Sequence, residues 1–408
     1  MATIFLVVIY LAFISLGIPD SLLGSAWPAM RPELGASFGY AGILSMIVAG
    51  GTIVSSLASG TMVRLVGTGK ITLISCCLTA GALLGFSTAP SLVWLIFLAV
   101  PLGLGGGAID AALNHYVAEN YKAHHMNWLH CFWGVGATMG PMIMSYYMAE
   151  HHSWRDGYAA VSIIQFALAV ILLVTLPLWK RIAATREVER LNYKIPQGQA
   201  GSEPVRSAGG SNANVLRIKG VKPTLVAFLF YCGVESTVGL WGASYMVGAR
   251  NMTAETAAGW ISLYYGGITI GRLITGFIAL KVHNRLLIRC GQMIAIAGGL
   301  MLLFPLPQLF LAGLILVGLG LAPIYPGLLH ETPARFGKEN SAKLMGYQMA
   351  VAYTGTTFLP PLFGAIATQT SIALFPFIVL AFNVLMMMSA EKVNYMLNNR
   401  PNSKGMHL

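Results

Sequence analysis

Long apolar runs, separated by short polar segments, follow one another along almost the whole chain. Each run has the length of about 20 residues that an α-helix needs to cross roughly 30 Å of hydrocarbon. Because a backbone inside lipid must satisfy its own hydrogen bonds, such runs predict transmembrane helices. The pattern predicts twelve spans, at residues 3–26, 39–65, 70–89, 92–118, 127–149, 157–179, 223–247, 256–280, 285–305, 308–332, 342–367 and 370–392.

A longer polar stretch at 180–222 divides these spans into six and six. It combines basic residues with a Gly/Ser-rich centre at 198–211, a composition typical of flexible linkers. We therefore predict an all-α integral membrane protein made of two six-helix bundles. Its expected parts are an N-terminal bundle at 1–179, the linker at 180–222, a C-terminal bundle at 223–393 and a tail at 394–408.

The composition agrees with this interpretation and excludes a soluble enzyme. Of the 408 residues, 56 % are hydrophobic and only 10 % are charged, against about 25 % charged in soluble domains. No charged segment precedes the first apolar run, so we expect that run to be a span and not a cleaved signal peptide. The five cysteines lie within apolar runs without metal-ligand spacing, and we expect packing roles and no metal site.

The net charge of +11 reflects topology and not binding to nucleic acid. The odd-numbered loops contain only Arg31, Arg155 and Arg250, whereas most other Lys and Arg residues lie at the termini and in the even-numbered loops. Positive loops stay on the cytoplasmic side. We therefore expect both termini and the linker to be cytoplasmic, in a plasma (inner) membrane protein that is a monomer in the lipid bilayer.

This layout resembles the major facilitator superfamily, whose two bundles rock around a site near the bilayer midplane. The loop signature of that family, Gly-x-x-x-Asp-Arg/Lys-x-Gly, is half present after the second span. The glycines and the positive charges of the signature are kept at Gly60, Arg64, Gly67 and Lys70, without the Asp. The corresponding stretch after the eighth span, 276–285, also lacks an acid.

A few charged residues interrupt the spans, and each is a functional candidate because a charge inside a membrane costs several kcal/mol. Asp110 follows a glycine-rich run and precedes Asn114 by four residues, so both side chains share a helix face. A partly desolvated carboxylate there could take up and release a proton near neutral pH. The alternative is an Asp that only bonds a neighbouring helix. Asp20 follows Pro19, and a cavity role and a helix break near the outer surface are both open.

Other polar and aromatic residues are candidates for substrate binding. His130 opens the fifth span with Trp133 one turn later, although His130 could simply be interfacial. Glu235, with Trp241 two turns on, suits a sugar ring, whose faces stack on aromatics, although aromatics in spans mostly serve packing. Arg272 could pair with a substrate anion or form a structural salt bridge. Further expected contributions to the cavity wall come from Tyr265, His330 beside Glu331, and Gln348.

The fourth and fifth spans resemble the fucose permease branch of the superfamily. That branch has a glycine-rich run, an acid, an Asn four residues on, and then Pro-Phe-Val, where this chain has Asp110, Asn114 and 115–117. Asn, Gln, Phe and Gly of its fifth span fall at Asn127, His130, Phe132 and Gly136, and Tyr325-Pro326 resembles its aromatic-Pro segment in the tenth span. The resemblance implies proton coupling and sugar recognition by the acids at the positions of Asp20 and Asp110.

Three functions remain open from the sequence. The first is a transporter for proton-coupled uptake of a small polar solute, a sugar or sugar-like compound, by alternating access. The second is a proton-driven antiporter that exports a small molecule with the same acids. The third, an intramembrane enzyme or receptor, would need a nucleophile-base pair or a metal-ligand set, and no HExxH or CxxC motif occurs. We expect no cofactor, with H⁺ as the coupling ion and Na⁺ as the alternative.

Overall fold

Helices make up the elements of the computed structural model, which describes residues 2–121, 123–194, 215–279 and 281–398. The first half contains α1 (Ala2–Asp20), α2 (Leu22–Glu33), α3 (Tyr40–Val66), α4 (Thr68–Ser87), α5 (Leu92–Asn120), α6 (Ala123–Glu150) and α7 (Trp154–Lys194). The second half contains the short 3₁₀ turn η1 (Val215–Arg217), α8 (Val221–Arg250), α9 (Ala254–Ile278), α10 (Asn284–Met301), α11 (Pro307–Leu321), α12 (Ile324–His330), α13 (Thr332–Phe336), α14 (Lys338–Gln369), the 3₁₀ turn η2 (Ile372–Leu374) and α15 (Phe375–Asn398).

These helices form the twelve predicted crossings, because α1 with α2 and α11 with α12 each make one interrupted crossing. Ten of these crossings in the described residues are long and apolar enough to span a membrane, judged by length and composition alone. The other two, α6 and α10, contain more polar residues, including His130 in α6 and Arg289 in α10. The all-helical twelve-span fold class is confirmed.

The boundaries differ from the predicted ones by a few residues at several helices, and three differences change the description of a crossing. The first crossing is broken at Ser21, directly after Pro19 and Asp20, and runs on to Glu33 instead of ending near residue 26. The tenth crossing is broken between Leu321 and Ile324, at Pro323, which has no N–H to donate to a continuous helix. The sixth crossing continues to Lys194, so the predicted linker begins as helix. Residues 195–214 of that linker and 399–408 of the tail lie outside the described residues.

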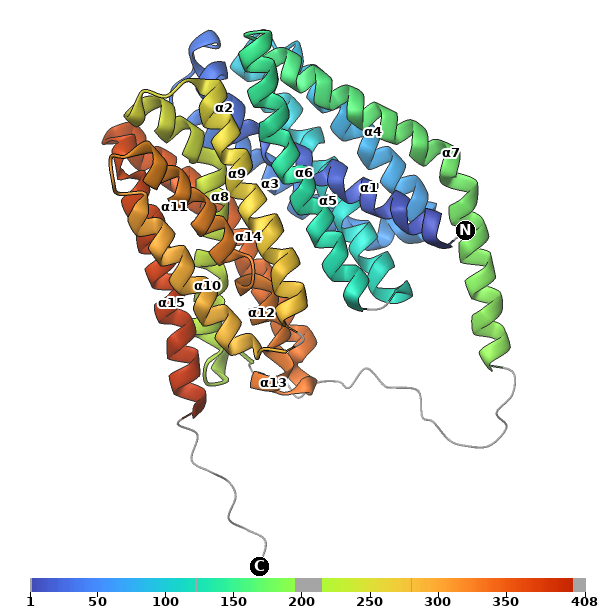
Figure 1. Ribbon diagram of the computed structural model, residues 1–408. Coiled ribbons are helices and arrows are strands. Elements are labelled where there is room, and N and C mark those ends of the chain that lie inside the picture. The colour runs from blue at the N-terminus through green and yellow to red at the C-terminus, as the bar shows by residue number, and fades with distance from the viewer. Residues whose placement is uncertain (1, 122, 195–214, 280, 399–408) are drawn as a thin grey trace, which may run out of the picture.

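The helices pack in two groups (Figure 1). In the first, α5 packs on α3 and α4, α1 on α6, and α4 on α7; in the second, α8 packs on α14 and α15, and α11 on α9 and α10. The groups meet where α2, α3 and α6 contact α8, α9 and α14. That residues 1–179 and 223–393 are the bounds of two six-helix bundles stays a prediction.

Close approach of the two groups depends on glycine. At Gly24 in α2, an added methyl group would collide with the carbonyl oxygen of Gly239 in α8, and at Gly42 in α3 it would press against Pro361 in α14. Small residues at helix contacts in membranes let backbones approach closely. These contacts lie near one end of the molecule, and the helices of the two groups diverge toward the other (Figure 1).

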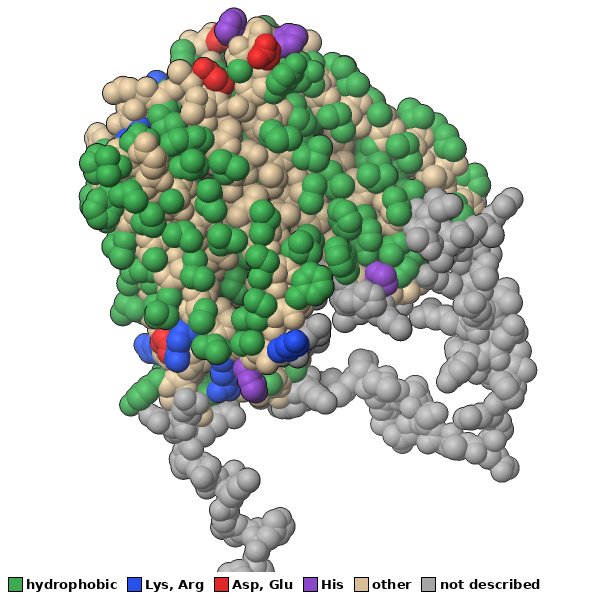
Figure 2. All heavy atoms as spheres, in the orientation of Figure 1, with side chains coloured by type: hydrophobic (Ala, Val, Ile, Leu, Met, Phe, Trp, Pro, Cys, Tyr) green, Lys and Arg blue, Asp and Glu red, His purple; other side chains and the backbone are tan. Residues whose placement is uncertain are grey.

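We call that other end, where α8 begins at Val221 and α15 ends at Asn398, the basic end. Its exposed cations include Lys281 and Arg285. We call the end where α2 leads into α3 the opposite end. Figure 2 shows hydrophobic side chains over the middle of the visible face and charged side chains gathered toward both ends. Large apolar side chains such as Leu57 and Phe97 are exposed, as expected for a surface that faces lipid.

Candidate functional site

A hydrogen bond between α1 and α6 marks the centre of the candidate site. Asp20 is the last residue of α1, next to the break at Ser21, and its side chain is exposed. The indole Nε1 of Trp133 in α6 donates to Oδ2 of Asp20 over 2.8 Å. The carboxylate therefore lies at the last residue of α1, directly before the helix break.

The ring face of Trp133 contacts the second half of the molecule. The guanidinium carbon of Arg272 in α9 lies 5.3 Å from the centroid of the Trp133 ring, within the range of a cation–π contact. Arg272 also pairs with Glu235 in α8 at 3.3 Å and donates to the hydroxyl of Tyr231 at 3.4 Å. Four helices from both halves therefore meet in one connected group of polar side chains.

Asp110 lies on α5 behind the glycine-rich run. Methyl groups at Gly103 and Gly107 would collide with carbonyl oxygens of α3, so α5 is pressed tightly onto that helix. Nδ2 of Asn114 donates to Oδ1 of Asp110 over 2.8 Å and also to its backbone carbonyl over 3.0 Å. Asp110 is close enough to Asp20 for their charges to repel each other. The predicted Asp110–Asn114 pair on one helix face is present.

Two further predicted residues lie around this group. His130 in α6 is exposed, and its ring meets the edge of Phe13 in α1 at 6.1 Å between centroids. Tyr265 in α9 is buried, and its hydroxyl lies where a side chain on Gly239 would be. The charge of Asp20 is close enough to interact with the Tyr265 hydroxyl.

Three predicted residues lie apart from the group. Trp241 is fully buried, stacks on Phe38 at 4.5 Å and donates its indole N–H to the carbonyl of Pro360 at 2.8 Å. It therefore fastens α8 to α14 and to the loop before α3. His330 lies at the basic end and shares a 2.9 Å hydrogen bond with Asn284.

Gln348 is also buried at the basic end, where it exchanges hydrogen bonds of 3.0 and 2.9 Å with Thr332. Glu331, the residue before Thr332, pairs with Arg285 and Arg335. Arg289 forms a bidentate salt bridge with Glu391 in α15. The sequence reasoning missed the partners of this network, because the basic residues were read only as topology signals. It also missed Tyr353 in α14, whose hydroxyl is close enough to interact with the charges of Asp110 and Asp20.

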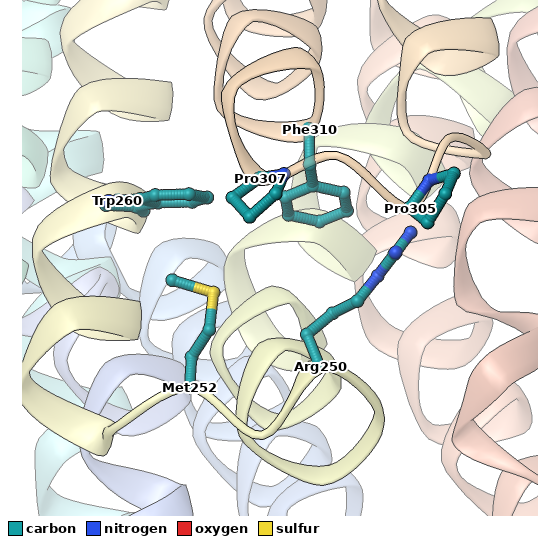
Figure 3. Close-up of a pocket in the computed structure, with 6 residues that line it drawn as sticks. All are labelled: Arg250, Met252, Trp260, Pro305, Pro307 and Phe310. Atoms are coloured by element: carbon teal, nitrogen blue, oxygen red, sulfur yellow. The ribbon is translucent and has the colours of Figure 1, made fainter.

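A small cavity at the opposite end has a structural role (Figure 3). Its volume is about 60 Å³, and it is lined by Arg250, Met252, Trp260, Pro305, Pro307 and Phe310. Arg250 donates to the carbonyls of Leu302 and Phe304 and lies 5.5 Å over the Phe310 ring. The guanidinium thereby ties the end of α8 to the turn between α10 and α11. Among the residues that the structure describes, no three His, Cys, Asp or Glu side chains group so as to hold a metal ion.

Comparisons with known proteins agree with this architecture. A family model described as the Major Facilitator Superfamily matches residues 9–330 and 224–404. The glucose/mannose transporter GlcP of Bacillus subtilis (strain 168) is 25 % identical over 244 residues, which are 57 % of this chain and 56 % of that protein, so the match spans little more than half of its length. The membrane protein MosC of Rhizobium meliloti is 22 % identical over 382 residues, covering 90 % of this chain and 85 % of that protein.

Solved structures show the same fold at low sequence identity. A D-xylose-proton symporter superposes with a TM-score of 0.71 at 14 % identity and covers 99 % of both chains. A bacterial homolog of the human lysosomal transporter Spinster, in an inward-facing and unoccupied conformation, gives a TM-score of 0.71 at 12 % identity over 98 % of both chains.

Proposed function

The chain belongs to the major facilitator superfamily, and we propose that it couples proton entry to the uptake of a small polar solute, a sugar or sugar-like compound, by alternating access. Membership makes it a secondary transporter in the membrane and not an enzyme. The coupling ion, the substrate and the direction of transport belong to the proposal.

One observation carries the proton-coupling part. In the described structure, Asp20 and Asp110 accept their side-chain hydrogen bonds from neutral donors, the Trp133 indole and the Asn114 amide. A neutral donor leaves a carboxylate able to accept a proton, whereas a salt bridge would hold it ionised. Asp20 is in addition exposed, so a proton can reach it.

The substrate class rests on the surroundings of these acids and on the relatives. Arg272 already pairs with Glu235, so its charge is balanced and does not call for an anionic solute. The Trp133 ring and the polar atoms around it combine a stacking surface with hydrogen-bonding groups, as a sugar requires. The name of GlcP and that of the D-xylose-proton symporter both refer to sugars.

The proposal includes an orientation. We propose that both termini and the linker at 180–222 lie on the cytoplasmic side of the plasma (inner) membrane, because the distribution of Lys and Arg follows the positive-inside rule. The helices of the two halves meet toward the opposite end and diverge toward the basic end (Figure 1). The proposal takes this arrangement as the inward-facing conformation.

Uptake into proteoliposomes tests the proposal. Radiolabelled glucose, mannose and xylose are each offered with an inward proton gradient, an inward sodium gradient or no gradient. We expect at least one sugar to accumulate only with the proton gradient. Accumulation driven by sodium alone would overturn proton coupling. Loss of preloaded solute under the same inward proton gradient would establish antiport and export in place of uptake.

A further inference from the structure

We propose that Trp133 is the positioning residue through which the charge state of Asp20 in one half controls the contact with Arg272 in the other half. The inference rests on the proposed function only in taking Asp20 as a group that gains and loses a proton. It assigns to Trp133 a role in conformational coupling in addition to any contact with substrate.

The two polar features of the indole point to different halves of the molecule. Its N–H edge donates to Asp20 of α1 over 2.8 Å. Its ring face lies 5.3 Å from the guanidinium carbon of Arg272 of α9. Beyond Arg272 lies Glu235 at 3.3 Å. An anion, an aromatic ring, a cation and a second anion thus follow one another across the boundary between the halves.

Ionised Asp20 strengthens every contact in this series. An N–H donated to a carboxylate is about twice as strong as one donated to a neutral acceptor. A negative charge at the indole edge also increases the attraction of the ring for the guanidinium, because a cation–π contact is electrostatic. When Asp20 is protonated, both effects weaken, and Arg272 remains held by Glu235 and Tyr231 within its own half.

The position of Trp133 gives this change a consequence for the whole molecule. The seam between α6 and α9 includes the hydrogen bond from Ser262 to the Thr138 carbonyl at 2.8 Å and the pair Thr138–Thr269 at 3.3 Å. Trp133 and Arg272 continue this seam toward the basic end, where the halves diverge (Figure 1). Ionisation of Asp20 therefore favours the conformation described here, and protonation favours separation of α6 from α9.

Linkage makes the effect reciprocal. If ionised Asp20 stabilises this conformation, the conformation in turn makes Asp20 release its proton more readily than one in which Trp133 and Arg272 are apart. With the basic end in the cytoplasm, protons are then taken up from outside and released inside, the direction that proton-driven transport requires.

Other titratable or charged groups face this series from the surrounding helices. They are His130 and Cys131 of α6, Asp110 of α5, Tyr231 of α8, Tyr265 of α9, and Tyr353 of α14. Because several of these groups can respond to pH, the test changes Trp133 itself and leaves all of them in place.

The test measures conformation and needs no substrate. Ser37→Cys, in the loop before α3, and Thr370→Cys, after α14, are exposed positions on the two halves at the opposite end. They are spin-labelled with the exposed Cys77 and Cys290 replaced by Ser. The distance distribution is recorded by pulsed electron paramagnetic resonance in lipid nanodiscs between about pH 5 and about pH 8.

We expect the short-distance population to rise with pH. The ratio of the short-distance to the longer-distance population should change by about ten-fold, a size typical of coupled sites. Trp133→Phe keeps a ring but removes the N–H, and should reduce the pH response to about two-fold or less. Asp20→Asn should abolish the response. Trp128→Phe, an exposed position on the same helix, should keep the full response.

Arg272→Lys provides a second variant if Trp133→Phe does not fold. It retains the positive charge beside Glu235 but loses the planar group that stacks on the indole, and its pH response should also be reduced. A flat response in the unsubstituted protein, or a full response in Trp133→Phe, Arg272→Lys or Asp20→Asn, would overturn the inference. Proton-driven uptake could still stand in that case. Conversely, failure of proton-driven uptake with the expected pH response intact would remove the proposed function alone.

Discussion

Arg272 and Glu235 pair at 3.3 Å between α9 and α8, and their side chains are only 16 % and 17 % exposed. The pair lies within one half of the molecule, but the guanidinium also stacks on Trp133 of the other half. The charges of Arg272 and Glu235 thus balance each other within one half, while the guanidinium of Arg272 contacts both halves. This arrangement combines the two roles that the sequence left open for Arg272, a structural ion pair and a place in the central site.

Removing one partner of this pair should destabilise the protein. Glu235→Ala leaves the guanidinium with the Tyr231 hydroxyl and the Trp133 ring, and we expect the free energy of unfolding to fall by roughly 1–3 kcal/mol. The double replacement Glu235→Met with Arg272→Met should recover much of the loss, because apolar groups need no partner. Thermal unfolding of purified protein in detergent measures both. Asp156→Ala, at an exposed position, is the control and should change little. A double variant less stable than either single variant would contradict this account.

Asp110→Asn should separate substrate binding from proton coupling. The substituted amide oxygen can still accept the hydrogen bond from Asn114, which spans 2.8 Å in the native chain, but the side chain no longer titrates. We expect uptake driven by a pH gradient to fall by at least about ten-fold, while exchange of labelled for unlabelled solute persists. Both are measured in proteoliposomes, with Asp156→Asn as the control. Native accumulation in both Asp110→Asn and Asp20→Asn would show that neither acid is an essential proton carrier.

The apolar runs were enough to predict the number of crossings, because the bilayer sets both the length and the composition of each one. The break at Pro323 was not predicted, and a helix break after Pro19 was only one of two alternatives for Asp20. A broken crossing has the same apolar composition as a continuous one, and Pro19 alone does not decide whether a helix bends or stops. The helical continuation to Lys194 was missed because a polar helix has no apolar run to mark it.

For the candidate site, the sequence likewise identified residues but did not determine where their side chains lie. Asp20, Asp110, Glu235 and Arg272 were found from the sequence because a charge within a span is costly enough to need a reason. Whether a span residue faces the centre, its own bundle or lipid depends on how the helices pack. For that reason Trp241, His330 and Gln348 were equally plausible from the sequence, although the structure places them apart from the Asp20–Trp133–Arg272 contacts.

The topology can be tested at two exposed loops. Ser37→Cys precedes α3 at the opposite end, and His283→Cys precedes α10 at the basic end. In a background that lacks the exposed Cys77 and Cys290, an impermeant maleimide added to intact cells should label Ser37→Cys and not His283→Cys. Both positions should react after the cells are opened, which controls for intrinsic reactivity. The reverse labelling pattern would invert the proposed orientation.

The contact between Gly24 and Gly239 predicts a way to shift the conformational equilibrium without touching the polar site. In the closed opposite end, the carbonyl oxygen of Gly239 occupies the space where a methyl group on Gly24 would lie. Because a backbone atom cannot rotate away, Gly24→Ala must push α2 from α8, and overpacking of this kind costs about 1–3 kcal/mol. This cost applies only while the two helices are in contact, so the variant should favour conformations that are open at the opposite end.

With spin labels at Ser37→Cys and Thr370→Cys, the short-distance population of Gly24→Ala should fall by about ten-fold or more relative to the longer-distance one. Gly50→Ala in α3 is the matched control, because a methyl group there meets no atom within 4 Å. Unchanged distances in Gly24→Ala with native stability would mean that α2 and α8 can separate without opening the molecule. In that case the seam between α6 and α9, and not the glycine contact, would hold the opposite end closed.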